Sequence, residues 1–368
     1  MSTSPLHRLS ALGQSVWIDS LSRTMLRTGE LEALMREDAV TGVTSNPTIF
    51  QKALAEAGAY DDSLRELLEH TDDPSEIFHA LAKEDISEAC DLMRPVWDAT
   101  GGGDGYVSIE VDPGLAMDAE ATLEQAMRFH TEINRPNLYV KIPATKPGLI
   151  AIEEMIARGR SINITLIFSL NRHTEVMEAY LSGLERLVED GGDPSQVHSV
   201  ASFFVSRVDT EADRRLDEVG APAELKGKLA VANAKVAYQH YLETFAGQRW
   251  DALLARGAST QRCLWASTST KNPAYPDDLY VEELIGPETV NTMPLETMEA
   301  FQDHGVVERT LDRDVDQAHE IFRRVAAAGV DYDDVTDTLE REGVEKFTAS
   351  FDDLLAGIRA RRAALSAA

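Results

Sequence analysis

The stretch NLYVKIPAT, residues 137–145, places a lysine in the middle of a run that otherwise reads as a buried β-strand. Successive side chains of a strand point to opposite faces, so Leu138, Val140 and Ile142 share one face. Lys141 lies on the other face, where an ammonium group is costly unless it has a partner or a chemical task. The other residues of the chain therefore have to be searched for the partner or the chemical task of Lys141.

Apolar, β-branched runs like this one recur along the chain, separated by stretches with helical periodicity. Ile77, Ile86 and Met93, for example, lie along one side of a predicted helix at 77–93. Alternating strands and helices are typical of a parallel sheet with crossover helices, and eight strands favour a (β/α)8 barrel, the TIM-barrel class of α/β fold. A doubly wound open sheet is the alternative, but no GxGxxG follows the first strand. The predicted strands are 15–21, 39–47, 106–113, 137–145, 161–169, 198–207, 262–269 and 288–294.

No Pro/Ser-rich linker or fixed-period repeat divides the chain, so residues 1–368 are predicted to form a single barrel domain. Residues 295–368 predict an extension of acidic amphipathic helices that packs on the barrel or forms an interface. The glycine run at 101–105 precedes a strand and opens no helix, so it indicates a loop and not a phosphate cradle.

Composition excludes several classes of function. The formal net charge of -28 argues against a nucleic-acid-binding or anionic-membrane surface. Cys90 and Cys263 are the only cysteines and form no CxxC motif, so neither a disulfide framework nor a cysteine zinc site is expected. A reducing cytoplasm fits best. The N-terminus has no basic head before a long apolar core, and no apolar run is long enough to span a bilayer, so neither export nor a membrane span is expected.

Four other predicted strands show the same alternation of apolar and polar residues as 137–145. In each, one parity is apolar and faces helices, so the polar set points into the barrel, toward the carboxyl ends of the strands. Lys141 would therefore meet these polar groups inside the barrel. They are Asp19, Thr44, Asn46, Ser108, Glu110, Asp112, Asn163, Thr165 and Ser169.

Several of these residues also have an ordinary structural explanation. A lysine in a strand can lie at a rim or in a structural ion pair. Asp19 can cap the following helix, and Asn46, which precedes a proline, is a common turn residue. Glu110 is harder to explain in this way, because a buried carboxylate is unfavourable unless a cation or hydrogen-bond donors lie beside it.

A lysine enclosed in a barrel can act as a nucleophile, because burial disfavours the charged ammonium form. The neutral amine attacks a ketone, and dehydration of the carbinolamine gives a Schiff base. Its cationic nitrogen is an electron sink for making or breaking an adjacent C–C bond. Of two nearby carboxylates, one can move protons while the carbinolamine forms and loses water. The other can take the proton of the hydroxyl that becomes an aldehyde.

A set of motifs together closely resembles the transaldolase family. They are WIDSLSR, GVTSNPTIF, SIEVDP, YVKIPAT, INITLIFS and SFFVSR, in the order that the family shows. The resemblance implies a (β/α)8 barrel of the class I aldolase type, without a metal or an organic cofactor. It also implies that the substrates are phosphorylated sugars. A dihydroxyacetone unit would move from sedoheptulose 7-phosphate to glyceraldehyde 3-phosphate, giving erythrose 4-phosphate and fructose 6-phosphate in the non-oxidative pentose phosphate pathway.

The resemblance assigns catalytic roles to four residues of this chain. Lys141 matches the Schiff-base lysine. Glu110 matches the carboxylate that works through a water also held by Thr165. Asp19 matches the residue that removes the hydroxyl proton during C–C cleavage and returns it in the aldol step.

The resemblance also assigns substrate-binding roles. Asn46 and Asn163 match amides that hydrogen-bond the hydroxyls of the dihydroxyacetone fragment, with Thr44 and Ser202 near the same end. Arg207 follows the predicted sixth strand, where a guanidinium can grip a phosphate through two parallel hydrogen bonds.

Two points around the phosphate site stay open. Arg207 could instead form a surface salt bridge with Asp209. The seventh strand departs from the pattern of many transaldolases, which carry a serine and an arginine two residues apart, because this chain reads ASTSTKN. We expect Ser267 to keep the serine role and Lys271, with Ser269, to replace the arginine.

Three alternatives to a transaldolase remain. A fructose 6-phosphate aldolase of the same barrel family typically has a tyrosine near the position of Phe204 and lacks the acid at the position of Glu110. A barrel glycosidase using Asp19 and Glu110 as its carboxylate pair leaves Lys141 without a task. A catalytically inactive phosphosugar-binding barrel is the alternative outside enzymology. Whether the chain is a monomer or a homodimer is undecided.

Overall fold

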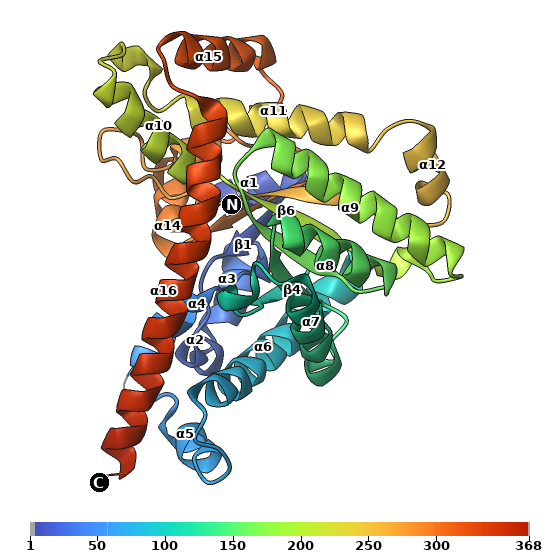
Figure 1. Cartoon of the computed structure of the whole chain (residues 1–368), viewed down its shortest axis with the longest axis vertical. Helices are drawn as coiled ribbons and strands as arrows, with labels where there is room; N and C mark the ends of the chain where they lie inside the picture. Colours follow the sequence, from blue (N-terminus) through green and yellow to red (C-terminus); the bar gives the residue numbers. More distant parts are fainter. Residues whose placement is uncertain (1–3, 57, 367–368) are drawn as a thin grey trace.

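The computed structural model describes residues 4–56 and 58–366, and within them eight parallel strands close into a barrel. Each strand pairs with its neighbours in chain order, and β1 pairs with β8 to close the ring. Helices surround the barrel (Figure 1). The predicted (β/α)8 barrel is therefore confirmed, and every predicted strand overlaps an observed one. The strands are β1 (Gln14–Ile18), β2 (Val40–Val43), β3 (Val107–Glu110), β4 (Leu138–Pro143), β5 (Ile162–Ile167), β6 (Ser199–Phe204), β7 (Gln261–Ala266) and β8 (Thr289–Met293).

Several helices begin at a side chain that caps their free backbone N–H groups. Ser22, Thr145 and Ser169 each accept a hydrogen bond from the backbone N–H three residues ahead. The predicted helix at 77–93 is confirmed as part of α6. The helices are α1 (Pro5–Ala11), α2 (Arg23–Thr28), α3 (Glu30–Glu37), α4 (Pro47–Ala55), α5 (Asp61–Leu67), α6 (Pro74–Ala99), α7 (Ala119–Ile133), α8 (Lys146–Ala157), α9 (Leu170–Glu189), α10 (Ser206–Glu218), α11 (Leu229–Thr244), α12 (Gln248–Leu254), α13 (Leu279–Glu282), α14 (Leu295–His304), α15 (Val315–Ala327) and α16 (Tyr332–Ser366).

Aromatic rings fill the barrel toward the amino ends of the strands. The ring centroids of Trp17 and Tyr139 lie 6.1 Å apart, and Tyr139 stacks on Tyr106 at 3.9 Å. Asp104, in the glycine-rich loop before β3, accepts a hydrogen bond from Trp17 Nε1 at 2.8 Å and lies 3.7 Å from an Arg262 nitrogen. This floor is closed by packed side chains, so a cavity inside the barrel can open only at the carboxyl ends of the strands.

The predicted alternation of side chains fails at two positions just past strand ends. Asp112 was expected to point into the barrel, but β3 ends at Glu110, and the Asp112 carboxylate contacts His79 of α6 at 2.7 Å. Ser169 was expected there too, but the backbone of Leu166 takes a φ of 60° and Ser169 caps α9. Alternation holds only within a regular strand, and both residues lie beyond the end of theirs.

The C-terminal helix α16 runs as a long rod beside the barrel (Figure 1) and packs against α4, α6 and α10. Its Phe351 ring lies 5.5 Å from Phe78 of α6 in an edge-to-face arrangement, and Ser350 accepts a hydrogen bond from Thr48 of α4 at 2.9 Å. These contacts place α16 beside the helices that follow β2 and β6. None of the described helices is long and apolar enough to cross a membrane.

Gly42 of β2 is needed for the aromatic floor, because a Cβ at this position would lie 2.4 Å from Cε2 of Trp17. We expect Gly42→Ala to lower the free energy of unfolding by about 2 kcal/mol, because the Trp17 ring cannot move without disturbing its neighbours. Urea denaturation followed by circular dichroism measures this change. Gly114→Ala is the matched control, since its Cβ would meet nothing within 4 Å. Equal stability of the two variants would contradict the proposed packing constraint.

Candidate active site

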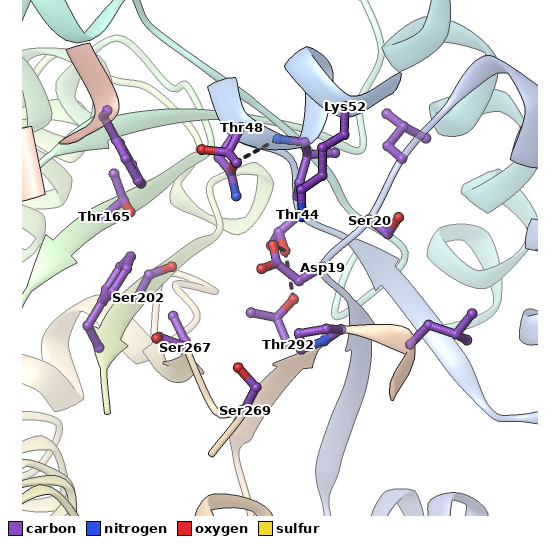
Figure 2. Close-up of a pocket in the computed structure, with 18 of the residues that line it drawn as sticks. Asp19, Ser20, Thr44, Thr48, Lys52, Thr165, Ser202, Ser267, Ser269 and Thr292 are labelled. Carbon is purple, nitrogen blue, oxygen red and sulfur yellow. Dashed lines mark hydrogen bonds between the residues drawn. The ribbon is translucent and has the colours of Figure 1, made fainter. Parts of the chain in front are cut away.

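A cavity of about 490 Å³ opens where the carboxyl ends of the strands meet (Figure 2). This is the end at which (β/α)8 barrels build active sites. All but two of the predicted site residues line it, and the exceptions are Glu110 and Asn163. The predicted residues in its wall are Asp19, Thr44, Asn46, Lys141, Thr165, Ser202, Phe204, Arg207, Ser267, Ser269 and Lys271.

Lys141 and Glu110 form a buried ion pair at the bottom of the cavity. The pairing of β3 with β4 sets Glu110 opposite Lys141, and Lys141 Nζ lies 3.3 Å from Glu110 Oε2. The ammonium also donates to the backbone oxygen of Ser45 at 3.1 Å. Neither Glu110 oxygen accepts a well-directed hydrogen bond from the described residues. Burial raises the pKa of Glu110, and the Lys141 charge opposes that rise. Glu110 is therefore a carboxyl suited to exchanging a proton near the amine.

Asp19 lies directly after β1 and is held by a short chain of hydroxyls. Thr44 Oγ1 donates to Asp19 Oδ1 at 2.6 Å and lies 2.6 Å from Thr292 Oγ1. Burial raises the pKa of Asp19, with the Lys141 charge as the largest opposing effect. Asp19 does not cap the next helix, because Ser22 caps α2. Its carboxylate is thus fixed in the cavity wall.

Asn46 both caps a helix and lines the cavity. Its side-chain oxygen accepts from the backbone N–H of Ile49 at 3.0 Å, at the start of α4. The turn explanation and the site explanation therefore apply to the same residue, because the cap uses only the oxygen of the amide.

Asn163 lies beneath the cavity and is fully buried. Its Nδ2 donates to Ser108 Oγ at 3.2 Å, and its Oδ1 accepts from Ser202 Oγ at 2.7 Å. Ser202 reaches the cavity wall, so Asn163 positions a residue that does line it. The neighbouring hydroxyl of Thr165 is buried and has no hydrogen-bond partner among the described residues.

Arg207, at the start of α10, is held by aromatic rings. Its guanidinium carbon lies 5.2 Å from the ring centroid of Phe204 and 6.0 Å from that of Phe347 on α16. Burial lowers the pKa of Arg207, and the carboxyl of Asp19 is the largest opposing effect. Arg207 does not pair with Asp209, which accepts hydrogen bonds from Ala230 N and the hydroxyl of Tyr280. Stacking leaves the guanidinium edge available for an anion.

The segment after β7 brings a second cation to the cavity. Lys271 Nζ donates to Ser269 Oγ, and both side chains line the wall. Burial lowers the pKa of Lys271, which the charge of Glu296 opposes. Ser267 has a left-handed φ of 56°, unusual for a residue with a Cβ, and its hydroxyl lies 3.0 Å from Ser206 Oγ. This constrained backbone turns the segment toward the cavity.

Sequence analysis missed several residues of the wall. Thr292 had no clear signal, because apolar Val290 shares its parity and the polar residues Thr289 and Asn291 lie on the other face. Lys52 of α4 and Phe347 of α16 had no signal either, because their places depend on how those helices pack.

Among the described residues, the group with the spacing of a metal site is Asp277, Asp278 and His304. None of the three lines the cavity. The cavity offers the amine of Lys141, the carboxyl of Asp19, the amide of Asn46, several hydroxyls and further cations, and Glu110 lies 3.3 Å from the amine. These are the groups that bind a polyhydroxylated anion and move protons on it.

The fold and the cavity define a (β/α)8-barrel enzyme with a buried lysine and two carboxyls at the carboxyl ends of its strands. The model of the family described as Transaldolase/Fructose-6-phosphate aldolase matches residues 16–358, and the chain belongs to this family. The resemblance stated from the motifs is thus confirmed, and the glycosidase alternative is excluded.

The chain is also similar to several curated proteins over nearly their whole length. It is 54% identical over 367 residues to a transaldolase of Acidothermus cellulolyticus, which covers 98% of this chain and 99% of the relative. A transaldolase of Frankia alni is 52% identical, covering 97% of each chain. A transaldolase of Mycobacterium marinum is 50% identical, covering 98% of each.

Asp209, two residues from Arg207 on α10, provides a test of pH dependence. Burial raises its pKa from 3.8 to about 7. Because the folded-state pKa is the higher one, the contribution of this group to stability is complete below about pH 4 and is lost as the pH rises through about 7. Asp209→Asn removes this titration, so its stability relative to wild type should increase by about 2 kcal/mol between pH 5 and pH 8.

Urea unfolding of both proteins at the two pH values measures the change. Asp251→Asn, at an exposed position of α12, is the control and should show no comparable pH dependence. A constant stability difference between Asp209→Asn and wild type would place the titration of Asp209 outside this interval.

Proposed function

We propose that the chain is a transaldolase that works through a Schiff base on Lys141. It transfers a dihydroxyacetone unit from sedoheptulose 7-phosphate to glyceraldehyde 3-phosphate, giving erythrose 4-phosphate and fructose 6-phosphate. The observation that carries the proposal is the buried contact of Lys141 with Glu110 at 3.3 Å, beside a cavity lined by hydroxyls, an amide and cations. The relatives named transaldolase, similar over nearly the full length, support it.

In the first step, the neutral Lys141 amine attacks the ketone carbon of the donor. The nitrogen loses a proton, the former ketone oxygen gains protons, and water leaves to give the iminium. Glu110, 3.3 Å from the nitrogen, relays these protons, and its raised pKa suits a group that both accepts and donates them. Because Glu110 does not line the cavity, it acts through the lysine nitrogen or through a water that Thr165 also holds.

In the second step, Asp19 takes the proton of the hydroxyl on the carbon beyond the bond that breaks. The electron pair of the C–C bond moves into the iminium, an aldehyde leaves, and an enamine stays on Lys141. The acceptor aldehyde then enters, the enamine attacks it, and Asp19 returns the proton. Hydrolysis of the new iminium releases the ketose. The hydrogen bond from Thr44 keeps the Asp19 carboxylate oriented throughout.

The enamine has to be retained until the acceptor arrives, because early release would turn the transferase into an aldolase. Asn46 and Ser202 are proposed to bind its hydroxyls, with Asn163 holding Ser202 in place. Phe204, beneath the guanidinium of Arg207, presents an apolar face to the cavity and favours the transferase over the related aldolase.

The substrate phosphate is proposed to bind at the cavity mouth. Arg207 offers a guanidinium edge, and Lys271 with Ser269 offers an ammonium and a hydroxyl from the segment after β7, where Ser267 fixes the turn. Residues 1–368 are proposed to form one domain, because Phe347 of the C-terminal helix lies in the wall of the cavity. The buried free cysteines are compatible with a cytoplasmic enzyme.

Borohydride trapping tests the Schiff base directly. With fructose 6-phosphate, wild type should gain a stable adduct on the peptide that carries Lys141, detected by mass spectrometry, and should lose transfer activity. Lys141→Met should show neither adduct nor transfer. Lys83→Met, at a partly exposed ion pair of α6, is the control and should still be labelled on Lys141. An adduct confined to another lysine would overturn the mechanism.

Asp19→Asn separates C–C cleavage from Schiff-base formation. The asparagine keeps an oxygen for the Thr44 hydrogen bond but cannot take the proton, so transfer should fall at least about 100-fold while borohydride trapping persists. Glu110→Gln should instead slow trapping itself, because it removes the proton relay beside the amine. Trapping lost in Asp19→Asn and retained at the normal rate in Glu110→Gln would reverse the two assigned roles.

A further inference from the structure

The helix α4 turns one face to the cavity, and that face carries a lysine that the mechanism above does not use. Thr48, Ile49, Lys52 and Ala53 all line the wall, which is the spacing of one helix face. Figure 2 shows Lys52 descending from α4 toward Thr44. The amino end of the helix is fixed by the Asn46 cap and by the hydrogen bond from Thr48 to Ser350 of α16.

Lys52 has no carboxylate partner within residues 4–56 and 58–366, although the chain carries 63 acidic residues against 35 basic ones. The acid one turn further on the same face, Glu56, accepts a hydrogen bond from Thr24 instead. Lys52 is an exposed side chain in the wall of the cavity. A lysine that points into a cavity and stays unpaired is available for an anionic ligand.

Lys52 stands on the opposite wall from the other cations. In a closed barrel of eight strands, β2 and β6 lie four strands apart and so face each other. Lys52 belongs to the helix after β2, whereas Arg207 follows β6 and Lys271 follows β7. Burial is the main cause of the lowered pKa of Lys271, and the charges of Arg207 and Lys52 act in the same direction. An anion between these cations would relieve their repulsion.

We propose that Lys52 is a further substrate-binding residue, which contacts the phosphate of the sugar substrates from the α4 wall. The inference rests on the proposed function, because it takes the anion to be a phosphate ester. It also accounts for the altered segment after β7. A lysine at 271 gives a phosphate one point charge in place of a bidentate guanidinium, and Lys52 supplies a second charge from the facing wall.

The test compares acceptors with and without a phosphate. In Lys52→Gln, the KM for glyceraldehyde 3-phosphate should rise about tenfold with kcat changed less than about twofold, because one charge-assisted contact is lost equally from ground and transition states. The KM for unphosphorylated glyceraldehyde should stay the same. Lys52→Arg should keep most of the affinity for the phosphorylated acceptor. Lys83→Gln is the control and should alter neither KM.

Calorimetry with inorganic phosphate gives a second readout that does not depend on turnover. The Kd for phosphate should rise about tenfold in Lys52→Gln and remain near wild type in Lys52→Arg. An unchanged KM and Kd in Lys52→Gln would overturn the proposal, as would an equal rise in KM for both acceptors, which would indicate a structural role. Borohydride trapping of wild type separates failure of the proposed function from failure of the proposed role of Lys52. The absence of an adduct on Lys141 would contradict the proposed function. The phosphate titration would still decide whether Lys52 binds the anion.

Discussion

The ion pair of Lys141 with Glu110 is the constraint on which the rest of the site depends. Two charges enclosed by a barrel are tolerated only when each has the other, and removing one leaves an unpaired buried charge. The pairing of β3 with β4 sets the two residues side by side, so the contact is fixed by backbone register and not by flexible loops. A proton can therefore pass between amine and carboxyl with little movement of either side chain.

Two layers of packing protect this pair. Below it, the rings of Trp17, Tyr139 and Tyr106 close the barrel and keep water from the amino ends of the strands. Above it, α16 brings Phe347 to the cavity wall and stacks it near Arg207. The C-terminal helix thus shapes the mouth of the cavity although it follows the whole barrel in sequence. Its contact with α4 links the walls that follow β2 and β6.

Sequence patterns could predict the barrel and most of the wall because both depend on short-range rules. Apolar runs mark all eight strands, and strand parity alone places Lys141, Glu110 and Asp19 in one interior. Parity failed at Asp112 and Ser169, which lie beyond the ends of β3 and β5. The places of Lys52 and Phe347 in the cavity wall could not be predicted from the sequence for another reason. A helical residue has no fixed inward parity, and its direction depends on the neighbours against which the helix packs.

The distribution of charge explains how so acidic a protein can accept an anionic substrate. A formal charge of -28 repels phosphate esters from the surface as a whole. Arg207, Lys271 and Lys52 nevertheless all line the same cavity. No ion pair within residues 4–56 and 58–366 neutralises them. A cavity with walls of low dielectric focuses that local positive potential. The cations stand at the mouth and Lys141 at the bottom, so a ketose phosphate that enters is oriented by its charge before any hydroxyl is bound. With the phosphate held at the mouth, its ketone end is directed toward the amine.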